Sequence, residues 1–367
     1  MSFPEARKKL LQTVTLAPAL GFVPVAVHFH LFDCLQLIGK PATSQDVYDH
    51  HRKHYGDKTN LSVQLTDDTL LLMGALGLVD VLPDDVYLAN DVTKFLVDMP
   101  SSQHGALHFT SEILLGSAFL MRRLVETDFS YPFQECQTPF QYAYESMGSE
   151  ISREHAYSIM GHTGRLDSFN TFMTGKFGRG ETMPNRVRNL GYDLDGLISQ
   201  SLQAKVPTVF VDIGGGRGEL LLELKDTFPK LEADNLVLQE YNSEIGEVPG
   251  VTEMSWNYKE EGHEQPVKGA LVYSLAFVLH NLSDVEAVKL LRKIAAAMSP
   301  QSRILIQELT KNTISATTHA AMIIMYGGRE RKSAEWKDLA ADAGLTVTFE
   351  AYPPVGECLV EMRKILN

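Results

Sequence analysis

Residues 206–240 have the sequence VPTVFVDIGGGRGELLLELKDTFPKLEADNLVLQE. This pattern predicts a buried strand, a glycine-rich turn, a helix, and a second strand that ends on an acid. The glycines of the turn, among them Gly214 and Gly216, let the backbone take positive φ values and let a ligand approach the main chain. Glu240 follows about twenty residues later, where a βαβ unit delivers a carboxylate to a ribose. We therefore expect a nucleoside-binding site.

The residues after the glycines exclude two common phosphate-binding sites. A P-loop requires Lys followed by Ser or Thr, whereas Gly218 is followed by Glu219 and Leu220. A dinucleotide fingerprint requires glycine at position 219, and a carboxylate there would repel a pyrophosphate at the helix N-terminus. The expected ligand is therefore a nucleoside without phosphates.

Strands and helices alternate from Val206 to the end of the chain. Strands are expected at 208–213, 235–240, 270–276, 303–309, 345–352 and 358–365, with helices at 219–228, 284–298 and 333–343. This alternation predicts a mostly parallel sheet covered by helices on both faces. Only a short Pro-Pro-Val-Gly link joins the last two strands, so they must be antiparallel.

The N-terminal part predicts a smaller, mainly helical domain. Two helices are expected in residues 5–35 with a break near Pro18–Gly21, then a helix capped by Thr43, a helix at 65–76, and a hairpin that pairs 79–82 with 86–88. Helix, helix, hairpin is the outline of a winged helix, a fold that often binds DNA. The second helix carries Asp67 and Asp68 and no Lys or Arg, which disfavours DNA binding and favours a packing or dimerisation module.

Aromatic and methionine side chains recur at helical spacing in residues 106–200. Such stripes usually pack in a core. The alternative is that some of them line an apolar pocket, for which the candidates are His108, Tyr142, Met160, Phe169 and Met173. The sequence thus predicts three regions: a dimerisation domain at 1–105, a linker and substrate-pocket region at 106–200, and a ligand-binding domain at 201–367.

Composition narrows the partners and the compartment. The formal net charge of −13 disfavours nucleic acids and anionic membranes, because both attract clusters of Lys and Arg. Cys34, Cys136 and Cys358 lie outside CxxC or zinc-binding spacings, so we expect neither a disulfide nor a metal site. Residues 1–14 lack the apolar core of a signal peptide, and no run approaches membrane-spanning length. These features indicate a cytoplasmic protein.

Several motifs together resemble one enzyme family. VDIGGGRGELLLEL followed by LVLQE resembles the S-adenosylmethionine-binding region of class I methyltransferases. QPVKGALVYSLAFVLHNLSD, LLRKIAAAMSPQSRILIQEL and GGRERKSAEWKDLAADAGL are similar to the small-molecule O-methyltransferases of plants and fungi. The resemblance covers nearly the whole chain. It implies a Rossmann-like catalytic domain that binds S-adenosylmethionine, preceded by an N-terminal winged-helix domain that forms a homodimer.

The resemblance also implies which residues bind the cofactor. Asp212, Gly214 and Gly216 would approach its methionyl end and ribose, and Glu240 would hold the ribose hydroxyls where the family usually has Asp. Asn257 lies where the family commonly has an acid near the adenine. An amide can still accept a hydrogen bond from the adenine amino group.

A catalytic base is implied at His280, in VLHNLSD. Glu308 and Glu330 stand where the family has carboxylates that orient this histidine. A phenol with a pKa near 10 is a weak nucleophile at neutral pH, and a histidine can take its proton as the methyl group transfers. The alternative for Glu330 is an ion pair at the surface with Arg329 or Arg331.

The chain departs from the family near this base. His280 is followed by Asn281 rather than Asp, and Ala276 replaces a common Arg. The substrate side is expected to include His108, Trp256, His319 and Met325, of which Trp256 and His319 differ from the residues that are usual in the family.

These departures leave a second hypothesis open. Some fungal proteins that resemble this family bind S-adenosylmethionine and catalyse pericyclic or dehydration reactions, with hydrogen-bond donors that polarise a carbonyl. His280, Asn281, His319 and Trp256 could supply such a site. The retained base and its two carboxylates favour methylation of a hydroxyl on an aromatic or polyketide-like metabolite. A third hypothesis, a winged-helix regulator, is disfavoured by the acidic second helix.

Overall fold

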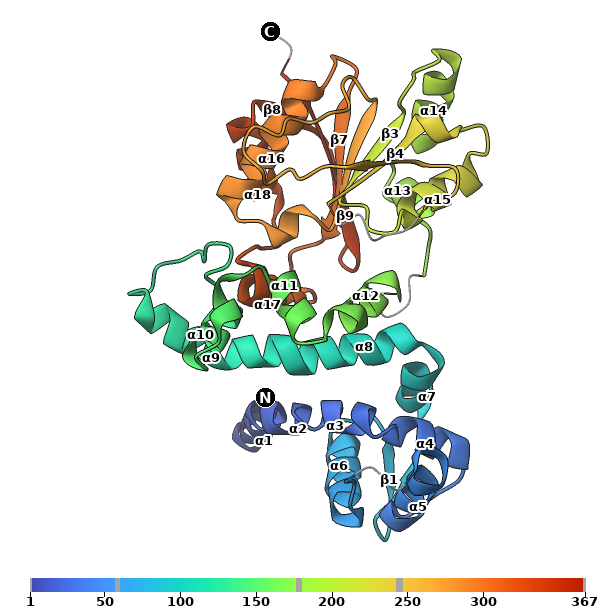
Figure 1. Ribbon diagram of the computed structural model, residues 1–367, viewed down its shortest axis with the longest axis vertical. Coiled ribbons are helices and arrows are strands. Elements are labelled where there is room, and N and C mark those ends of the chain that lie inside the picture. The colour runs from blue at the N-terminus through green and yellow to red at the C-terminus, as the bar shows by residue number, and fades with distance from the viewer. Residues whose placement is uncertain (1, 57–59, 176–179, 242–246, 366–367) are drawn as a thin grey trace. The chain divides into compact units, whose positions relative to one another are not determined.

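The computed structural model describes residues 2–56, 60–175, 180–241 and 247–365. The chain forms two compact units (Figure 1). The helical unit consists of Met1–Arg123 and Pro139–Arg179, and the sheet unit consists of Leu124–Thr138 and Gly180–Asn367. Residues 106–123 thus fold with the N-terminal helices, and residues 180–200 fold with the sheet. The functions assigned to the three predicted regions, which are dimerisation, substrate binding and cofactor binding, stay a prediction.

Helices make up most of the chain up to residue 175. The elements are α1 (Phe3–Val14), α2 (Leu16–Leu20), α3 (Val23–His28), α4 (Leu31–Ile38), α5 (Ser44–Tyr55), α6 (Val63–Ala75), β1 (Asp80–Leu82), β2 (Val86–Leu88), α7 (Asp91–Asp98), α8 (Pro100–His108), the π-helix η1 (Phe109–Ile113), α9 (Leu114–Glu126), α10 (Pro139–Ser146), the 3₁₀-helix η2 (Glu150–Arg153), α11 (Ala156–His162) and α12 (Leu166–Gly175).

The two helices predicted in residues 5–35 are four shorter ones, so that prediction was wrong. Pro18 does not break a helix but lies in the first turn of α2, where its missing N–H has no intrahelical partner to lose. One break, at Gly21 with Phe22, agrees with the break predicted near 18–21. The two others fall at Thr15 and at Phe29 with His30, whose φ of 51° is left-handed.

The hairpin and the capped helix were predicted correctly. β1 and β2 pair antiparallel, with Val81 opposite Tyr87. Thr43 caps α5 by accepting a hydrogen bond from the Asp46 N–H, which satisfies one of the otherwise unpaired donors at the helix start. Whether helices and hairpin together form a winged helix stays a prediction.

The N-terminal helices correct the expectation about long apolar runs. Phe3–His28 is long and apolar enough to cross a membrane by length and composition, and 17% of its most apolar window is buried. A membrane span, a signal sequence and the core helix of a soluble protein all meet that criterion. No residue of α1 is buried, and its exposed apolar side chains are Phe3, Leu10, Leu11 and Val14.

Strands and helices alternate in the sheet unit, as predicted. Its elements are α13 (Met183–Asn189), α14 (Leu194–Gln203), β3 (Phe210–Ile213), α15 (Glu219–Thr227), the 3₁₀-helix η3 (Ala233–Asn235), β4 (Leu236–Glu240), β5 (Thr252–Ser255), β6 (Val272–Ala276), the 3₁₀-helix η5 (Leu279–Asn281), α16 (Asp284–Ala297), β7 (Arg303–Leu309), α17 (Ala316–Tyr326), α18 (Ser333–Asp342), β8 (Leu345–Ala351) and β9 (Glu357–Lys364).

One seven-stranded sheet has the order β5-β4-β3-β6-β7-β9-β8. The pairs from β5 to β7 are parallel, and β9 is antiparallel to both β7 and β8, which confirms the expected last pair. The sequence did not predict β5, because this edge strand has only four residues and two of them, Glu253 and Ser255, are exposed. The order reverses between β3 and β6, and ligands of such sheets bind at the carboxyl ends of the strands beside that point.

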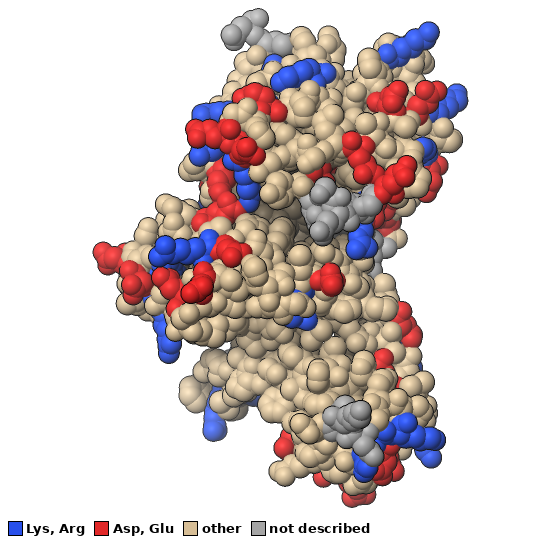
Figure 2. Space-filling model, in the orientation of Figure 1, with Lys and Arg blue, Asp and Glu red and all other residues tan. Residues whose placement is uncertain are grey.

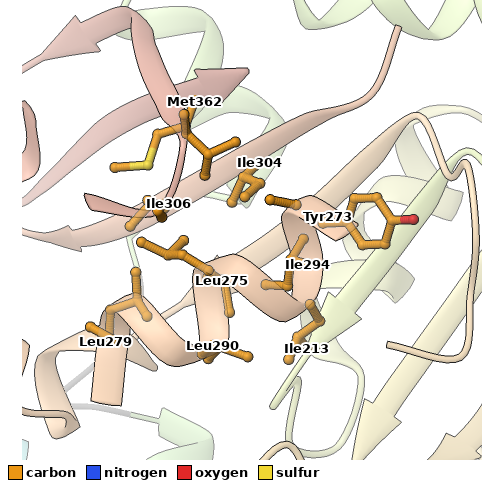
Figure 3. Packing of buried hydrophobic residues seen from close by; sticks show 14 of the residues in the cluster. Ile213, Tyr273, Leu275, Leu279, Leu290, Ile294, Ile304, Ile306 and Met362 are labelled. Carbon is orange, nitrogen blue, oxygen red and sulfur yellow. The ribbon is translucent and has the colours of Figure 1, made fainter. Parts of the chain in front are cut away.

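Apolar side chains cover both faces of the sheet. One cluster joins it to α16 and α18: Figure 3 shows Leu290 and Ile294 of α16 among Leu275 of β6, Ile304 and Ile306 of β7. A second cluster joins the other face to α13, α14 and α15 (Figure 1). Full burial of one such side chain stabilises the fold by about 1.5–3 kcal/mol.

The surface carries both positively and negatively charged side chains. On the face in view in Figure 2, Lys and Arg lie scattered among Asp and Glu. This distribution accompanies the net charge of −13.

Candidate active site

The glycine loop follows the fully buried strand β3. Gly214, Gly216 and Gly218 have φ values of 66°, 58° and 76°, a conformation that other residues rarely adopt. Gly215 is required for space, because a Cβ there would lie 2.4 Å from Oδ2 of Asp212. The carboxylate of Asp212 thus lies directly under the loop, with the residue 1% exposed.

Glu240 meets this loop at the end of β4. Its Oε2 accepts a hydrogen bond from the Gly216 N–H at 3.1 Å, and its Oε1 accepts one from the Tyr241 N–H at 2.8 Å. Residues that are 24 positions apart in sequence are thus brought together beside the reversal in strand order. A carboxylate that already binds the loop N–H is placed to exchange that contact for a ligand hydroxyl.

Trp256 and Asn257 follow the strand that the sequence did not predict. Trp256 N–H donates to the Glu240 carbonyl at 3.2 Å, and its indole lies in the core cluster, where it donates to the His263 carbonyl at 3.4 Å. Oδ1 of Asn257 accepts from the Lys259 N–H at 3.1 Å. The second lone pair of Oδ1 can still accept the hydrogen bond that is expected from an adenine amino group. The substrate-facing role of Trp256 stays a prediction.

His280 lies in η5, the turn that connects β6 with α16. The N–H groups of Leu279 and His280 both donate to Oε1 of Glu308, at 2.9 and 3.2 Å. The turn ends at Ser283, which caps α16 by accepting a hydrogen bond from the Glu286 N–H. The position of the turn is thus set by Glu308 of β7 on one side and by the N-cap of α16 on the other.

Two carboxylates face one nitrogen of the His280 ring. Nδ1 lies 2.8 Å from Oε1 of Glu330 and 3.3 Å from Oε2 of Glu308. Because a carboxylate only accepts hydrogen bonds, Nδ1 carries the proton and Nε2 is the basic nitrogen. Both glutamates are buried, and burial raises the pKa of Glu308 to about 7, an effect that His280 opposes.

The surface alternative for Glu330 was wrong. Arg329 pairs with Asp284 and Glu335, and Arg331 pairs with Asp284. Glu330 instead points inward to His280.

Comparisons with known proteins agree on the family. The family model described as an O-methyltransferase domain matches residues 195–346. The O-methyltransferase bfoE of Aspergillus brasiliensis is 71% identical over 366 residues, which are 99% of this chain and 98% of that protein. This chain belongs to the O-methyltransferase family. Membership confirms the expected enzyme class and its cofactor, S-adenosylmethionine.

Two further comparisons concern the family more widely. Demethylsterigmatocystin 6-O-methyltransferase stcP of Emericella nidulans is 33% identical over 150 residues, 40% of this chain and 73% of that protein. The solved structure of LepI from Aspergillus flavus in complex with S-adenosylmethionine has a TM-score of 0.79 and 21% identity, and covers 100% of this chain and 90% of that chain. The second comparison shows the fold. The pericyclase hypothesis is not favoured, because the relative at 71% identity is an O-methyltransferase.

The loop of this O-methyltransferase suits a cofactor without phosphates. Among the described residues, the atom nearest to a Cβ built on Gly216 would be Oε2 of Glu219, at 4.0 Å. Glu219 is the first residue of α15, where its negative charge would repel a phosphate. Bound S-adenosylmethionine carries a positive sulfonium and no phosphate, so Asp212, Glu219 and Glu240 match its charge.

Two other predicted residues lie around Glu330 and the turn, and a third, Met325, lies on α17. His319 on α17 accepts the Glu330 N–H at its Nδ1, at 3.0 Å. Burial, together with nearby Lys311, lowers the pKa of His319 and keeps its ring neutral. Asn281 Nδ2 donates to the Phe277 carbonyl at 3.4 Å. Met325 is fully buried.

Sequence reasoning missed Phe277 and the role of Arg331 in this O-methyltransferase. Phe277 has a φ of 58°, and its ring centre lies 5.5 Å from that of His280. Arg331 is completely buried and donates to carbonyls of the His280 turn. GGRER placed Arg331 beside Glu330, but an arginine after a glutamate usually indicates surface, and burial is not visible in sequence.

His108 lies in a separate polar cluster of the helical unit. Its Nδ1 is 3.1 Å from Oε2 of Glu112, whose Oε1 accepts from Nε of Arg165 at 2.7 Å. Burial opposes ionisation of Glu112, but hydrogen bonds from His108 and Arg165 hold its pKa below the usual value. The His108 ring also contacts Phe169 edge-on at 5.0 Å. Its assignment to the substrate side stays a prediction.

Proposed function

We propose that this methyltransferase methylates a phenolic or enolic hydroxyl of an aromatic, polyketide-like metabolite. The observation that carries the proposal is the His280 ring, whose Nδ1 faces two buried carboxylates. Such a histidine is suited to a proton that leaves a weakly acidic hydroxyl at neutral pH. The name of stcP, a 6-O-methyltransferase of demethylsterigmatocystin, supports the same substrate class.

His280 acts as the general base. Nε2 takes the hydroxyl proton, and Glu330 and Glu308 stabilise the imidazolium that forms, since each presents a carboxylate oxygen to Nδ1. The O–H electron pair would stay on the oxygen, which would bond to the methyl carbon as the bond from that carbon to the cofactor sulfur breaks and its electron pair stays on the sulfur. The proton on Nε2 would later pass to water. A positioned base of this kind accelerates a reaction by about 10²–10⁴-fold.

The cofactor would be held at the carboxyl ends of β3, β4 and β5. When bound, S-adenosylmethionine supplies an electrophilic methyl group. Asp212, Gly214 and Gly216 would hold its methionyl end and ribose, Glu240 its ribose hydroxyls, and Asn257 its adenine. Asn281 is proposed to take part in catalysis beside His280. His108, Trp256, His319 and Met325 are proposed to contact the substrate.

Label transfer tests the proposal. The purified chain is incubated with methyl-labelled S-adenosylmethionine and hydroxylated aromatic acceptors, namely a dihydroxyacetophenone, a trihydroxynaphthalene and a trihydroxyanthraquinone. We expect labelled methyl ether in the wild type and in the matched control His162→Ala, whose side chain is exposed and pairs with Glu154. His280→Ala should lose methylation by at least about 100-fold.

Three outcomes would count against this reaction. Cofactor-dependent product without label would reject methyl transfer, and near-normal methylation by His280→Ala would reject His280 as the base. A product in which the labelled methyl group is bonded to carbon rather than to oxygen would reject the hydroxyl as the acceptor.

We also propose a cytoplasmic homodimer. In support, α1 leaves Leu10, Leu11 and Val14 exposed, as expected of a helix that a second copy covers. Residues 1–105 would form the dimer, 106–200 would line the substrate pocket, and 201–367 would bind the cofactor. Fluorescent fusion protein concentrated on membranes would contradict the cytoplasmic location.

A further inference from the structure

Arg331 is a fully buried arginine that the reaction described above does not use. Arg331 is 0% exposed. Such burial is unusual for a guanidinium, which stays charged at any physiological pH. Buried charges require partners for all of their hydrogens. Those partners are therefore informative about what the side chain does.

The guanidinium binds the backbone of the turn that carries His280. Nη1 donates to the Leu279 carbonyl at 2.7 Å, and Nη2 donates to the Leu282 carbonyl at 2.8 Å. Nε donates to Oδ1 of Asp284, in the first turn of α16, at 2.9 Å. One planar group thus spans the turn from its first residue to the helix that follows.

Glu308 binds the same turn through its N–H groups, whereas Arg331 binds its carbonyl groups. That carboxylate accepts the N–H groups of Leu279 and His280, while Arg331 takes the carbonyls of Leu279 and Leu282. The peptide groups around His280 therefore lie between a carboxylate and a guanidinium. Neither side chain can move without releasing backbone groups that are buried from water.

The segment before Arg331 packs equally closely on this turn. A Cβ on Gly328 would lie 2.0 Å from the His280 carbonyl oxygen, so only glycine fits there. Glu330 binds the His280 ring, and the next residue, Arg331, binds its backbone. Side chain and main chain of the same histidine are thus fixed by two consecutive residues.

Charge adds a second contribution. Arg331 attracts Glu308 and so opposes the effect of burial on that carboxyl group. The guanidinium also lies over the ring of Trp336, with its carbon 5.4 Å from the ring centre. A lysine could supply the charge, but not two parallel N–H donors in a fixed plane.

We propose that Arg331 is a positioning residue, which fixes the backbone of the His280 turn and supplies positive charge beside Glu308. This inference rests on the proposed role of His280 as the base. Val278, in the same turn, would lie 3.0 Å from a Cβ on Gly214. A fixed turn therefore also fixes the base relative to the cofactor loop.

Two substitutions separate the geometry from the charge. Arg331→Lys keeps the charge and loses the planar pair of donors, whereas Arg331→Gln loses both. Arg329→Gln is the matched control, because that side chain lies two residues earlier and pairs with Asp284 and Glu335 rather than with the turn carbonyls. The full chain is used throughout, with an aromatic acceptor that the wild type methylates.

The measurements are kcat and KM across pH, calorimetric binding of S-adenosylmethionine, and the titration of the His280 imidazole by NMR of histidine-labelled protein. The titratable and charged groups near the His280 ring come from several elements. They are Glu308 of β7, Glu330 and Arg331 of the 327–332 segment, His319 of α17, Asp284 of α16 and Cys358 of β9.

Both Arg331 variants should lower kcat by about 10- to 100-fold, since small misplacements of a catalytic group are costly. Cofactor affinity should stay at the wild-type value. Arg331→Gln alone should move the His280 midpoint and the acid limb of kcat to higher pH, because loss of a positive charge favours the protonated forms. Arg329→Gln should match the wild type.

A wild-type kcat and an unmoved His280 midpoint in Arg331→Gln would overturn the proposal. So would a loss of kcat that only follows the loss of folded protein, with no shift in midpoint. Failure of the proposed function is distinguishable, because His280→Ala would then methylate normally whatever the Arg331 variants do.

Discussion

Single residues account for the chemistry of the site, and sequence identified about half of them. His280, Glu308 and Glu330 were predicted from their motifs, and the structure brings all three together. Their mutual distance was not predictable, because it depends on the 327–332 segment packing against η5. Phe277 and Arg331 escaped notice for a related reason: a positive φ and complete burial are properties of the folded chain.

Glu308 should make stability depend on pH. Its pKa rises from an ordinary value of 4.5 to about 7, so the folded state binds a proton more tightly than the unfolded state. The resulting stabilisation is fully present below pH 4.5 and is lost as pH rises to 7, and it corresponds to about 3 kcal/mol. In Glu308→Gln this decline should disappear from urea unfolding curves measured between pH 4.5 and 7.

The control for this experiment is Glu126→Gln, at an exposed position. That variant should keep the wild-type decline. An unchanged pH dependence in Glu308→Gln would show that another group causes it. The variant should still fold, since its amide oxygen can accept the Leu279 and His280 N–H groups.

At the scale of elements, prediction succeeded where a long periodic pattern existed and failed where a few residues decide. The strand at 303–309 was predicted to the residue, because its apolar run is bounded on both sides. β5 was missed as a short, half-exposed edge strand. The helices in residues 5–35 were miscounted because Pro18 lies in the first turn of α2 rather than ending a helix.

The connection between β6 and η5 provides a test of backbone strain beside the base. Phe277 holds a φ of 58°, which costs a side-chain-bearing residue about 1–2 kcal/mol relative to glycine. Phe277→Gly and Phe277→Ala both remove the ring beside His280, so both should lower kcat similarly. Chemical denaturation should show Phe277→Gly as the more stable of the two by about 1 kcal/mol. Equal stability of the two variants would mean that the left-handed conformation is not strained.

At the scale of the molecule, the alternation after Val206 was enough to predict a parallel sheet with an antiparallel last pair. The alternation did not predict how the chain divides into two units, because residues 139–179 belong to the helical unit although residues 124–138 before them belong to the sheet unit. Sequence periodicity shows which face of a helix is apolar but not which other segment covers it. None of the residues of α1 is buried, and its apolar side chains Leu10, Leu11 and Val14 are exposed.

The exposed face of α1 should therefore associate with a second copy of the chain. Each large apolar side chain that becomes buried in an interface contributes about 1.5–3 kcal/mol, so Leu10, Leu11 and Val14 together could hold two copies. Light scattering at micromolar concentration should give a dimer for the wild type and a monomer for Leu11→Glu with Val14→Glu. Gln12→Glu with Thr13→Glu adds the same charge to the same helix and should remain dimeric if those polar positions lie off the interface. A monomeric wild type would leave the apolar face to a different partner, and wild-type protein that sediments with lipid vesicles would assign that partner to a membrane.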